Sequence, residues 1–206
     1  MSGCDRQKIG QRALQREKRK QQILNCCLDA IVTKGYESMK IRDIADMLGI
    51  STGLFFNYFE SKEAVFEELV RTALKGPQGM AQLIGVIEDP VALFYSIARY
   101  ILDALASSSE TAKYFLLMQQ TMNREALPES IRILLNDFDS CTPFLPVIER
   151  GQQMGQIREG NPLALIVMFW SSLQGIAQMH AHDPALPLPS AEWVVDALRG
   201  RDTVQK

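Results

Sequence analysis

The chain has 206 residues, of which 47% are hydrophobic and 22% are charged, a composition typical of globular proteins and not of disordered chains. One or two domains are expected at this length, and a sizeable core can form without disulfides. The four Cys have no paired CxxC spacing and the two His lie close together near the C-terminus, which argues against a zinc finger or a disulfide framework. The N-terminus lacks the apolar segment of a secretion signal. We therefore expect a cytoplasmic protein with no metal and no other cofactor.

Charge is unevenly distributed along the chain. The formal net charge is −2, but residues 1–42 carry ten Lys and Arg against four Asp and Glu. Residues 76–206 carry nine basic and 14 acidic side chains. A basic end on an acidic body indicates an anionic partner that is met at one place, although a solvated, fraying N-terminal tail has the same charge pattern.

Four helices are predicted within the first seventy-five residues. Apolar residues recur at helical spacing from Gln11 to Lys34, where Gly35 ends the pattern. A short helix over 41–48 stops at Gly49, and Ser51 is a good N-cap for a third helix over 52–59. The fourth begins after Ser61 and is expected to end before Gly76-Pro77.

The second and third of these helices are separated only by Gly49-Ile50-Ser51. Two short helices joined by a three-residue turn that contains Gly are typical of a helix-turn-helix. Phe55 and Phe59 are spaced to pack the third helix inward. That leaves Thr52, Gly53, Phe56 and Asn57 on the opposite side, free to face a DNA groove. For Phe56 and Tyr58, core packing is an equally good interpretation.

Ile41-Arg-Asp-Ile-Ala-Asp-Met-Leu-Gly-Ile-Ser-Thr-Gly-Leu-Phe-Phe-Asn-Tyr-Phe-Glu-Ser-Lys-Glu resembles the DNA-binding segment of TetR-type transcriptional regulators. The glycine that ends the first helix, the Ile-Ala pair, Gly-Ile-Ser, the aromatic cluster and Ser-Lys-Glu fall at that family's spacing. The resemblance covers roughly residues 12–75. Phe56 is a departure, because a tyrosine is common at this position in the family.

The resemblance implies that residues 51–59 form the recognition helix, lying in the major groove of double-stranded DNA. Thr52, Gly53 and Asn57 would approach base edges, since Asn can pair with adenine through two hydrogen bonds. Phosphates would be held by the polar and basic side chains around them, namely Lys40, Arg42, Ser51, Tyr58 and Lys62.

Helices are also predicted throughout the remainder, over 90–106, 110–124, 128–139, 143–151, 161–180 and 190–199, and no useful alternating strand pattern appears. The chain is therefore expected to be all-α, with about nine or ten helices. By the resemblance, residues 12–75 form a three-helix helix-turn-helix DNA-binding head, and residues 76–206 form a helical body that binds a ligand and dimerises.

The segment 160–182 has no formally charged side chain and is long enough to test as a membrane span. Polar residues crowd its second half, so a buried helix is the better interpretation and no membrane partner is expected. In TetR-type regulators the last two long helices form a four-helix bundle with a second subunit. The corresponding homodimer residues here would be Leu163, Ile166, Trp170, Leu173, Ala177, Trp193 and Val194.

The body also contains many Met and aromatic side chains, which fill irregular spaces and line adaptable pockets. For any single residue, ordinary core packing is the better interpretation. As a set they fit the ligand cavity that the resemblance implies, for a small-molecule effector that is apolar or aromatic. The candidate pocket residues are Tyr100, Phe115, Met118, Met122, Phe144 and Phe169.

No Ser-His-Asp order, Gly-rich phosphate loop or HExxH is present, so we do not expect an enzyme. The sequence indicates a ligand-responsive, sequence-specific DNA-binding regulator, expected to repress as a homodimer on a palindromic operator. The alternatives are an activator of the same fold, or a helical ligand-binding protein without a DNA role.

Overall fold

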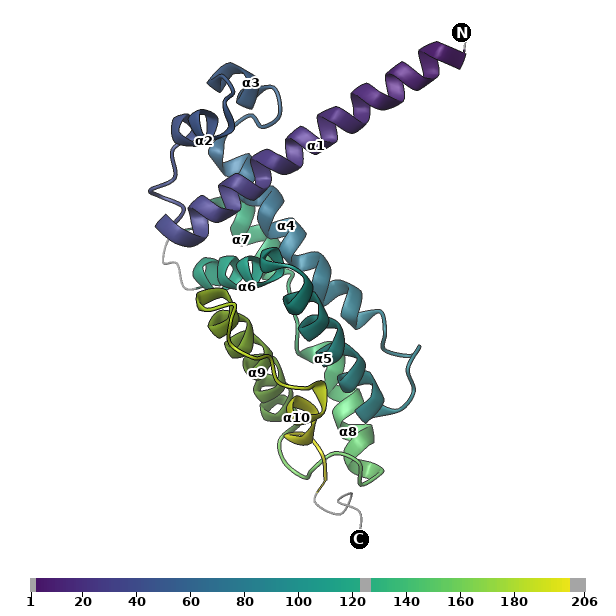
Figure 1. Ribbon diagram of the computed structural model, residues 1–206. Helices are drawn as coiled ribbons and strands as arrows, with labels where there is room; N and C mark the ends of the chain where they lie inside the picture. Colours follow the sequence, from purple (N-terminus) through teal and green to yellow (C-terminus); the bar gives the residue numbers. More distant parts are fainter. Residues whose placement is uncertain (1–2, 123–126, 201–206) are drawn as a thin grey trace.

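The protein is described by a computed structural model over residues 3–122 and 127–200, without side chains for residues 3–10. Within these ranges it is built of ten α-helices and one 3₁₀ turn (Figure 1). In chain order these are α1 (Gly3–Lys34), α2 (Ile41–Leu48), α3 (Thr52–Phe56), α4 (Lys62–Ala81), α5 (Pro90–Ser107), α6 (Ser109–Met122), α7 (Glu129–Asn136), the 3₁₀ turn (Thr142–Phe144), α8 (Leu145–Gln153), α9 (Pro162–His182) and α10 (Ala191–Asp196).

The prediction of an all-α chain with nine or ten helices is confirmed. Helix starts are set locally. The side chains of Ser61, Asp89 and Asn161 each accept a hydrogen bond from the backbone N–H three residues on, at the starts of α4, α5 and α9. Residues 123–126 and 201–206 lie outside the described part. Two predicted boundaries fall on these residues: the end of one helix at Arg124 and the end of the body at residue 206.

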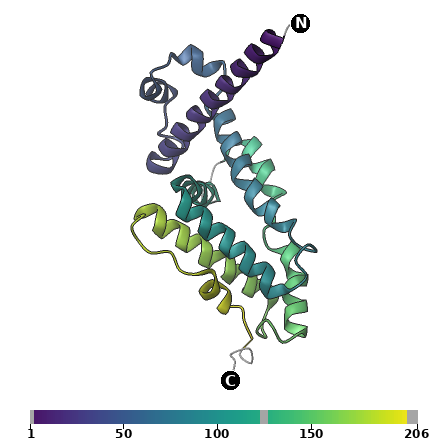
Figure 2. The same cartoon turned by 45° about the vertical axis from the view of Figure 1, so that its right-hand side comes forward.

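Two hydrophobic clusters hold the chain together. The upper cluster joins α1, α2, α3 and α4 and includes Leu117 of α6 and Ile131 of α7. The lower cluster joins α5, α8, α9 and α10 and includes Met80 of α4 and Ala112 of α6. Both views show the first group at one end of the molecule and the second at the other (Figures 1 and 2). Helices α4 and α6 therefore contribute to both clusters.

Helix α4 differs from the prediction. The expected end before Gly76 is wrong, because the helix continues through Gly76 and Pro77 to Ala81. Proline within a helix removes one backbone hydrogen bond, but the added turn buries Met80 in the lower cluster. The head and the body are therefore connected at this point by a continuous helix that carries Pro77.

Helix α5 ends at Ser107, and α6 departs from it at 113°. Helix α6 then crosses beneath the upper group of helices (Figure 1). Lys113 of α6 pairs with Asp29 of α1 at 2.5 Å, and the Gln120 side-chain amide donates to the Val32 carbonyl at 3.0 Å. On its other side, Phe115 accepts a hydrogen bond at its carbonyl from Gln174 of α9 at 3.2 Å. Helix α6 thus links the two groups of helices by directed contacts.

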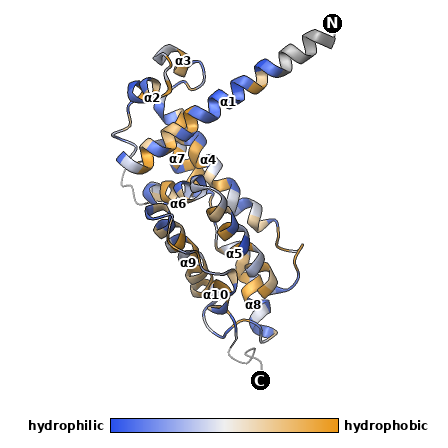
Figure 3. Cartoon of the chain, in the orientation of Figure 1, coloured by the Kyte–Doolittle hydropathy of each residue, from blue (hydrophilic) through white to orange (hydrophobic). Residues whose placement is uncertain are grey.

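Helix α9 has the length and composition of a membrane span, with a mean hydropathy of 1.3. The core helices of water-soluble proteins meet the same criterion. Here α9 buries Leu165, Ile166, Phe169, Leu173 and Ala177 against the lower cluster. Figure 3 shows the resulting concentration of hydrophobic residues on α5, α8 and α9, and the contrasting, largely hydrophilic middle of α1. Packing inside the protein accounts for this side of α9, whereas Leu163, Val167 and Met179 of the same helix are exposed.

Candidate nucleic-acid interface

The turn between α2 and α3 is fixed by backbone conformation and by capping. Gly49 ends α2 with φ of +62°, a left-handed conformation that costs glycine little. The Ile50 N–H donates to the Ala45 carbonyl at 3.0 Å. The Ser51 hydroxyl oxygen then accepts from the Leu54 N–H at 3.0 Å, which starts α3. This arrangement is the helix-turn-helix that the sequence predicted, but α3 ends at Phe56 and not at the predicted Phe59.

Helix α3 is anchored on one side by aromatic residues. The Phe55 and Phe59 side chains are buried, with ring centroids 6.0 Å apart. Thr52, Gly53 and Asn57 are exposed on the other side. A short polar surface is therefore held on a rigid apolar base, which is the arrangement that base recognition in a groove requires.

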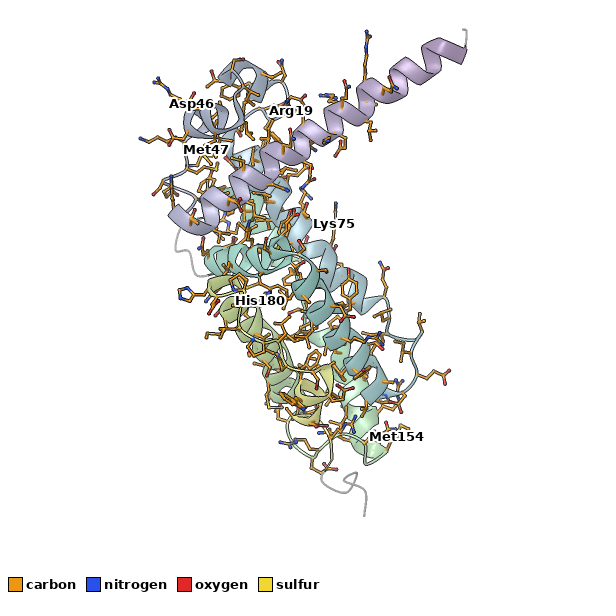
Figure 4. The ribbon with its side chains drawn as sticks, viewed as in Figure 1. Arg19, Asp46, Met47, Lys75, Met154 and His180 are labelled. Atoms are coloured by element: carbon orange, nitrogen blue, oxygen red, sulfur yellow. The ribbon has the colours of Figure 1, made fainter. Side chains whose placement is uncertain are left out.

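Two of the predicted phosphate-binding cations are free to reach outward. Lys40 is exposed immediately before α2. The Arg42 side chain is 86% exposed, and its Nε lies 4.0 Å from a carboxylate oxygen of Asp46. An exposed pair of this kind is worth about 0–1 kcal/mol, so it does not prevent Arg42 from binding a phosphate. Asp46 and Met47 lie on the outer surface of α2 (Figure 4).

Lys62 has a different environment from Lys40 and Arg42. Its ammonium donates to the Glu37 carbonyl at 3.0 Å and lies 4.4 Å from the centroid of the Tyr36 ring. These contacts connect the start of α4 to the turn between α1 and α2. Lys62 therefore stabilises the head internally, and its phosphate contact stays a prediction.

The side chains of Phe56 and Tyr58 have different surroundings in the structure. Phe56 is 49% exposed and makes an edge contact with Phe55 at 5.8 Å between centroids. Tyr58 is half-buried, and the Arg16 guanidinium carbon lies 5.8 Å from its ring centroid. The core-packing interpretation therefore does not describe Phe56, whose ring is half exposed at the end of α3.

The fold brings to this end of the molecule further residues that the sequence did not single out. Met47 of α2 and Leu54 of α3 are exposed apolar side chains of the helix-turn-helix. Arg12, Arg16 and Arg19 lie on one face of α1, and their spacing of four and three residues was a readable signal of that face. Their cationic character was noted in the sequence, but their orientation toward Tyr58 depends on how α1 packs.

The six predicted pocket residues do not lie together. Phe144 and Phe169 are buried in the lower cluster, and Phe115 packs at its edge. Met118 packs against the upper cluster, whereas Tyr100 and Met122 are exposed. The compact aromatic group is instead Phe94, Phe144, Phe169 and Trp170, with neighbouring centroids 5.0 to 6.0 Å apart.

The seven predicted dimer residues do not form one exposed surface either. Leu163 and Trp193 are exposed, the latter at 72%. Trp170 is half-buried, with its ring against Phe144 and Phe169. The other four are buried in the core of the same chain, because α9 and α10 turn these side chains inward. These are Ile166, Leu173, Ala177 and Val194.

The Cys26 and Cys27 side chains give no sign of thiol chemistry. Burial raises the pKa of the Cys27 thiol to about 12, with a further contribution from Cys26. Burial also raises the pKa of Cys26, followed by the effect of Asp29. Thiols with raised pKa are poor nucleophiles at neutral pH. Within residues 3–122 and 127–200, no group of three or more His, Cys, Asp or Glu could hold a metal ion.

Comparison with known proteins gives a consistent result. Residues 23–69 match the family model described as bacterial regulatory proteins, tetR family. The HTH-type transcriptional repressor KstR2 of Mycolicibacterium smegmatis is 33% identical over 177 residues, which are 85% of this chain and 84% of that protein. The HTH-type transcriptional regulator RutR of Escherichia coli K12 is 24% identical over 173 residues, 82% of this chain and 78% of that protein.

The fold is also shared with a solved structure. The ketosteroid transcriptional regulator KstR2 of Mycobacterium tuberculosis superimposes with a TM-score of 0.70, covering 89% of this chain and 96% of that one, at 17% identity. Three observations together establish the family: the helix-turn-helix geometry, the match to the family model, and a relative of 33% identity over most of both chains. The chain belongs to the TetR family of DNA-binding transcriptional regulators.

Proposed function

We propose that this protein is a repressor that binds a palindromic operator as a homodimer and leaves it when a small molecule binds the helical body. The observation that carries the proposal is the exposed polar surface of Thr52, Gly53 and Asn57 on a buried aromatic base. The name of its M. smegmatis relative, a transcriptional repressor, supports the sign of regulation. The proposal places the protein in the cytoplasm, with its DNA.

In this proposal α3 enters the major groove. Asn57 reads a base edge, and Gly53 allows the backbone to approach the DNA closely. Lys40, Arg42, Ser51 and Tyr58 contact phosphates on either side, and Lys62 supports them from the start of α4. Phosphate contacts position the helix, and base contacts specify the sequence.

A homodimer is proposed because one α3 reads only one half-site. A two-fold dimer presents two copies, which fit a palindrome whose half-sites are about 34 Å apart or a multiple of that spacing. The exposed apolar side chains Leu163 and Val167 of α9 and Trp193 of α10 support an interface on this part of the body. They replace the buried members of the set that the sequence suggested.

The proposed effector site is the aromatic group of Phe94, Phe144, Phe169 and Trp170. The Trp170 indole Nε1 is buried without a hydrogen-bond partner among the described residues. A buried donor left without a partner costs about 1–3 kcal/mol, so a ligand that supplies an acceptor gains affinity here. Because the rings touch one another, the ligand must displace at least one of them.

These requirements describe an apolar molecule of aromatic or fused-ring shape with at least one carbonyl or similar acceptor. The ketosteroid named for the M. tuberculosis regulator has both features, so this class is the first to test. Displacement of Phe169 or Trp170 would move α9, and the contact from Gln174 of α9 to α6 carries that movement toward the head. A ligand shifts DNA binding only by its different affinities for the two arrangements.

The experiment is selection of bound sequences from a random double-stranded DNA pool at about 0.15 M salt, which suppresses non-specific binding. We expect a palindrome. Asn57→Ala should relax preference at one position of each half-site, whereas Asn136→Ala, an exposed asparagine at the end of α7, should not. Recovery of no enriched sequence by folded protein would refute the operator proposal and favour a helical ligand-binding protein.

A further inference from the structure

A groove of about 610 Å³ lies between the first half of α1 and the end of the helix-turn-helix. It is open to solvent, and its walls are cationic and amide side chains with one aromatic ring. The lining residues are Arg12, Gln15, Arg16, Lys18, Arg19, Gln22 and Tyr58.

The periodicity of α1 explains why these side chains share one face. At 3.6 residues per turn, positions 12, 15, 16, 19 and 22 form a continuous stripe along a helix. The single carboxylate within residues 11–22 is Glu17. Five residues after Arg12, it points about 140° away from that side chain around the helix. The stripe is therefore cationic without an acidic member.

Contacts within the protein distinguish this stripe from Lys20. The Lys20 ammonium pairs with Glu68 of α4 at 2.6 Å and lies 5.6 Å from the centroid of the Phe59 ring. No ion pair is formed by Arg12, Arg16, Lys18 or Arg19 with any carboxylate in the described part of the chain. Lys20 thus holds α1 to the head, and the other cations are available to an external anion.

The position of the groove indicates which anionic molecule binds there. Tyr58 lines the groove and directly follows Asn57, so the groove adjoins the proposed base-reading surface. Helix α1 continues past the head as a projecting rod, with Arg19 where it passes the head (Figures 1 and 4). An extended row of cations beside a base-reading helix matches a row of phosphates, because DNA carries one negative charge per about 1.7 Å of its axis.

We infer that the stripe of Arg12, Arg16 and Arg19 on α1 is a second DNA-binding surface, which binds backbone phosphates flanking the major groove that α3 occupies. Gln15 and Gln22 add neutral donors, and Tyr58 positions Arg16 by its ring contact. The inference deepens the proposed function and rests on it. Each subunit would then contact DNA through two surfaces, α3 and the stripe on α1. Only α3 would read the base sequence.

The test compares a stripe variant, Arg12→Gln/Arg16→Gln/Arg19→Gln, with a control variant, Arg99→Gln/Arg132→Gln/Arg158→Gln. Both remove the same charge, and the control arginines lie on the body, exposed on the surface. Fluorescence anisotropy with the selected operator would measure Kd over a series of salt concentrations. Each lost phosphate contact lowers the slope of log K against log salt by about 0.9.

For the stripe variant we expect a slope reduced by between about 0.9 and 2.7, with an unchanged ratio of affinities for operator and a mutated operator. The control variant should keep the wild-type slope. Ethylation interference should lose signals at phosphates beside the half-sites in the stripe variant alone. If the triple variant melts early, Arg12→Gln/Arg19→Gln keeps the contact between Arg16 and Tyr58 and serves in its place.

An unchanged slope, or an equal change in the control variant, would overturn the inference while leaving the operator proposal intact. A lower operator preference in the stripe variant would also overturn it, because the stripe would then act by positioning α3. If wild-type protein shows no sequence preference but its salt slope still depends on the stripe, the operator proposal fails and the phosphate surface stands.

Discussion

Lys113 on α6 and Asp29 on α1 form an ion pair, with 2.5 Å between Nζ and Oδ1. The pair joins α6, which like α4 contributes to both hydrophobic clusters, to α1, which supports the head. Together with the hydrogen bond from Gln120 to Val32, it ties α6 to α1 at two points. Movement of α6 must therefore either move α1 or break these contacts.

The first prediction concerns this pair. Lys113→Gln and Asp29→Asn should each lower the free energy of unfolding by less than about 1 kcal/mol, because both side chains are partly exposed. The double variant should lose less than the sum of the two, since each single change already removes the interaction. Urea unfolding of the four proteins measures this. Strict additivity would show that the two groups do not interact in solution.

A substitution at Gly53 should affect folding stability and DNA binding in opposite directions. A Cβ at this position would meet only the Ser51 hydroxyl oxygen, at 3.8 Å, which is an ordinary contact. Gly53→Ala should therefore keep or raise stability, by up to about 1 kcal/mol, and weaken operator binding by blocking close approach of α3. Thermal melting and operator Kd check both parts.

Gly79→Ala is the matched control for Gly53→Ala, because a Cβ there meets nothing within 4 Å and the residue is exposed inside α4. It should also raise stability by up to about 1 kcal/mol, with operator affinity unchanged in the absence of effector. Equal operator affinities for wild type and Gly53→Ala would contradict close approach at Gly53.

Phe56 stands where a tyrosine is common in the family. Its ring is half exposed, so Phe56→Tyr can add a hydroxyl without burying it. We expect unchanged stability and tighter binding to operator and mutated operator alike. One new hydrogen bond to a charged phosphate contributes about 1.5–3 kcal/mol, or roughly ten- to 150-fold in Kd. A gain confined to the operator would assign Phe56 to base recognition instead.

Tyr114 of α6 predicts a pH dependence. Burial raises the pKa of its hydroxyl to about 12, with smaller contributions from Glu110 and Glu68. The folded state disfavours the ionised form, so this stabilisation is complete below about pH 10 and is lost as pH rises from about 10 to about 12. The difference in unfolding free energy between wild type and Tyr114→Phe should change over that interval and remain constant from pH 7 to 9. A constant difference throughout would place the hydroxyl in water.

A substitution at Trp193 tests the proposed dimer interface on α9 and α10. Because its side chain is 72% exposed in the single chain, Trp193→Asp should leave secondary structure intact and shift sedimentation equilibrium toward monomer. Weaker operator binding should accompany the shift. Ile133→Asp on α7, also an exposed apolar position, is the control and should sediment like wild type. A dimer unaffected by Trp193→Asp would move the interface elsewhere.

Much of the head could be predicted from sequence because its signals are local. Gly49 and Ser51 mark a turn through backbone conformation and capping, and the spacing of Phe55 and Phe59 places both on one side of a helix. None of these depends on distant parts of the chain. The same locality explains the agreement between predicted and observed starts of α5 and α9, each of which carries proline directly after a capping side chain.

Tertiary packing decided the rest. Gly76 and Pro77 predict the end of a helix, yet α4 passes through them because its last turn buries Met80 against the body. Lys62 is drawn to Tyr36 and Glu37, and four of the proposed interface residues are turned into the core. Periodicity fixes which side chains share a face of a helix, but the partner of that face depends on contacts between residues far apart in sequence. For the same reason the arginines of α1 were visible in sequence, whereas the groove beside Tyr58 was not.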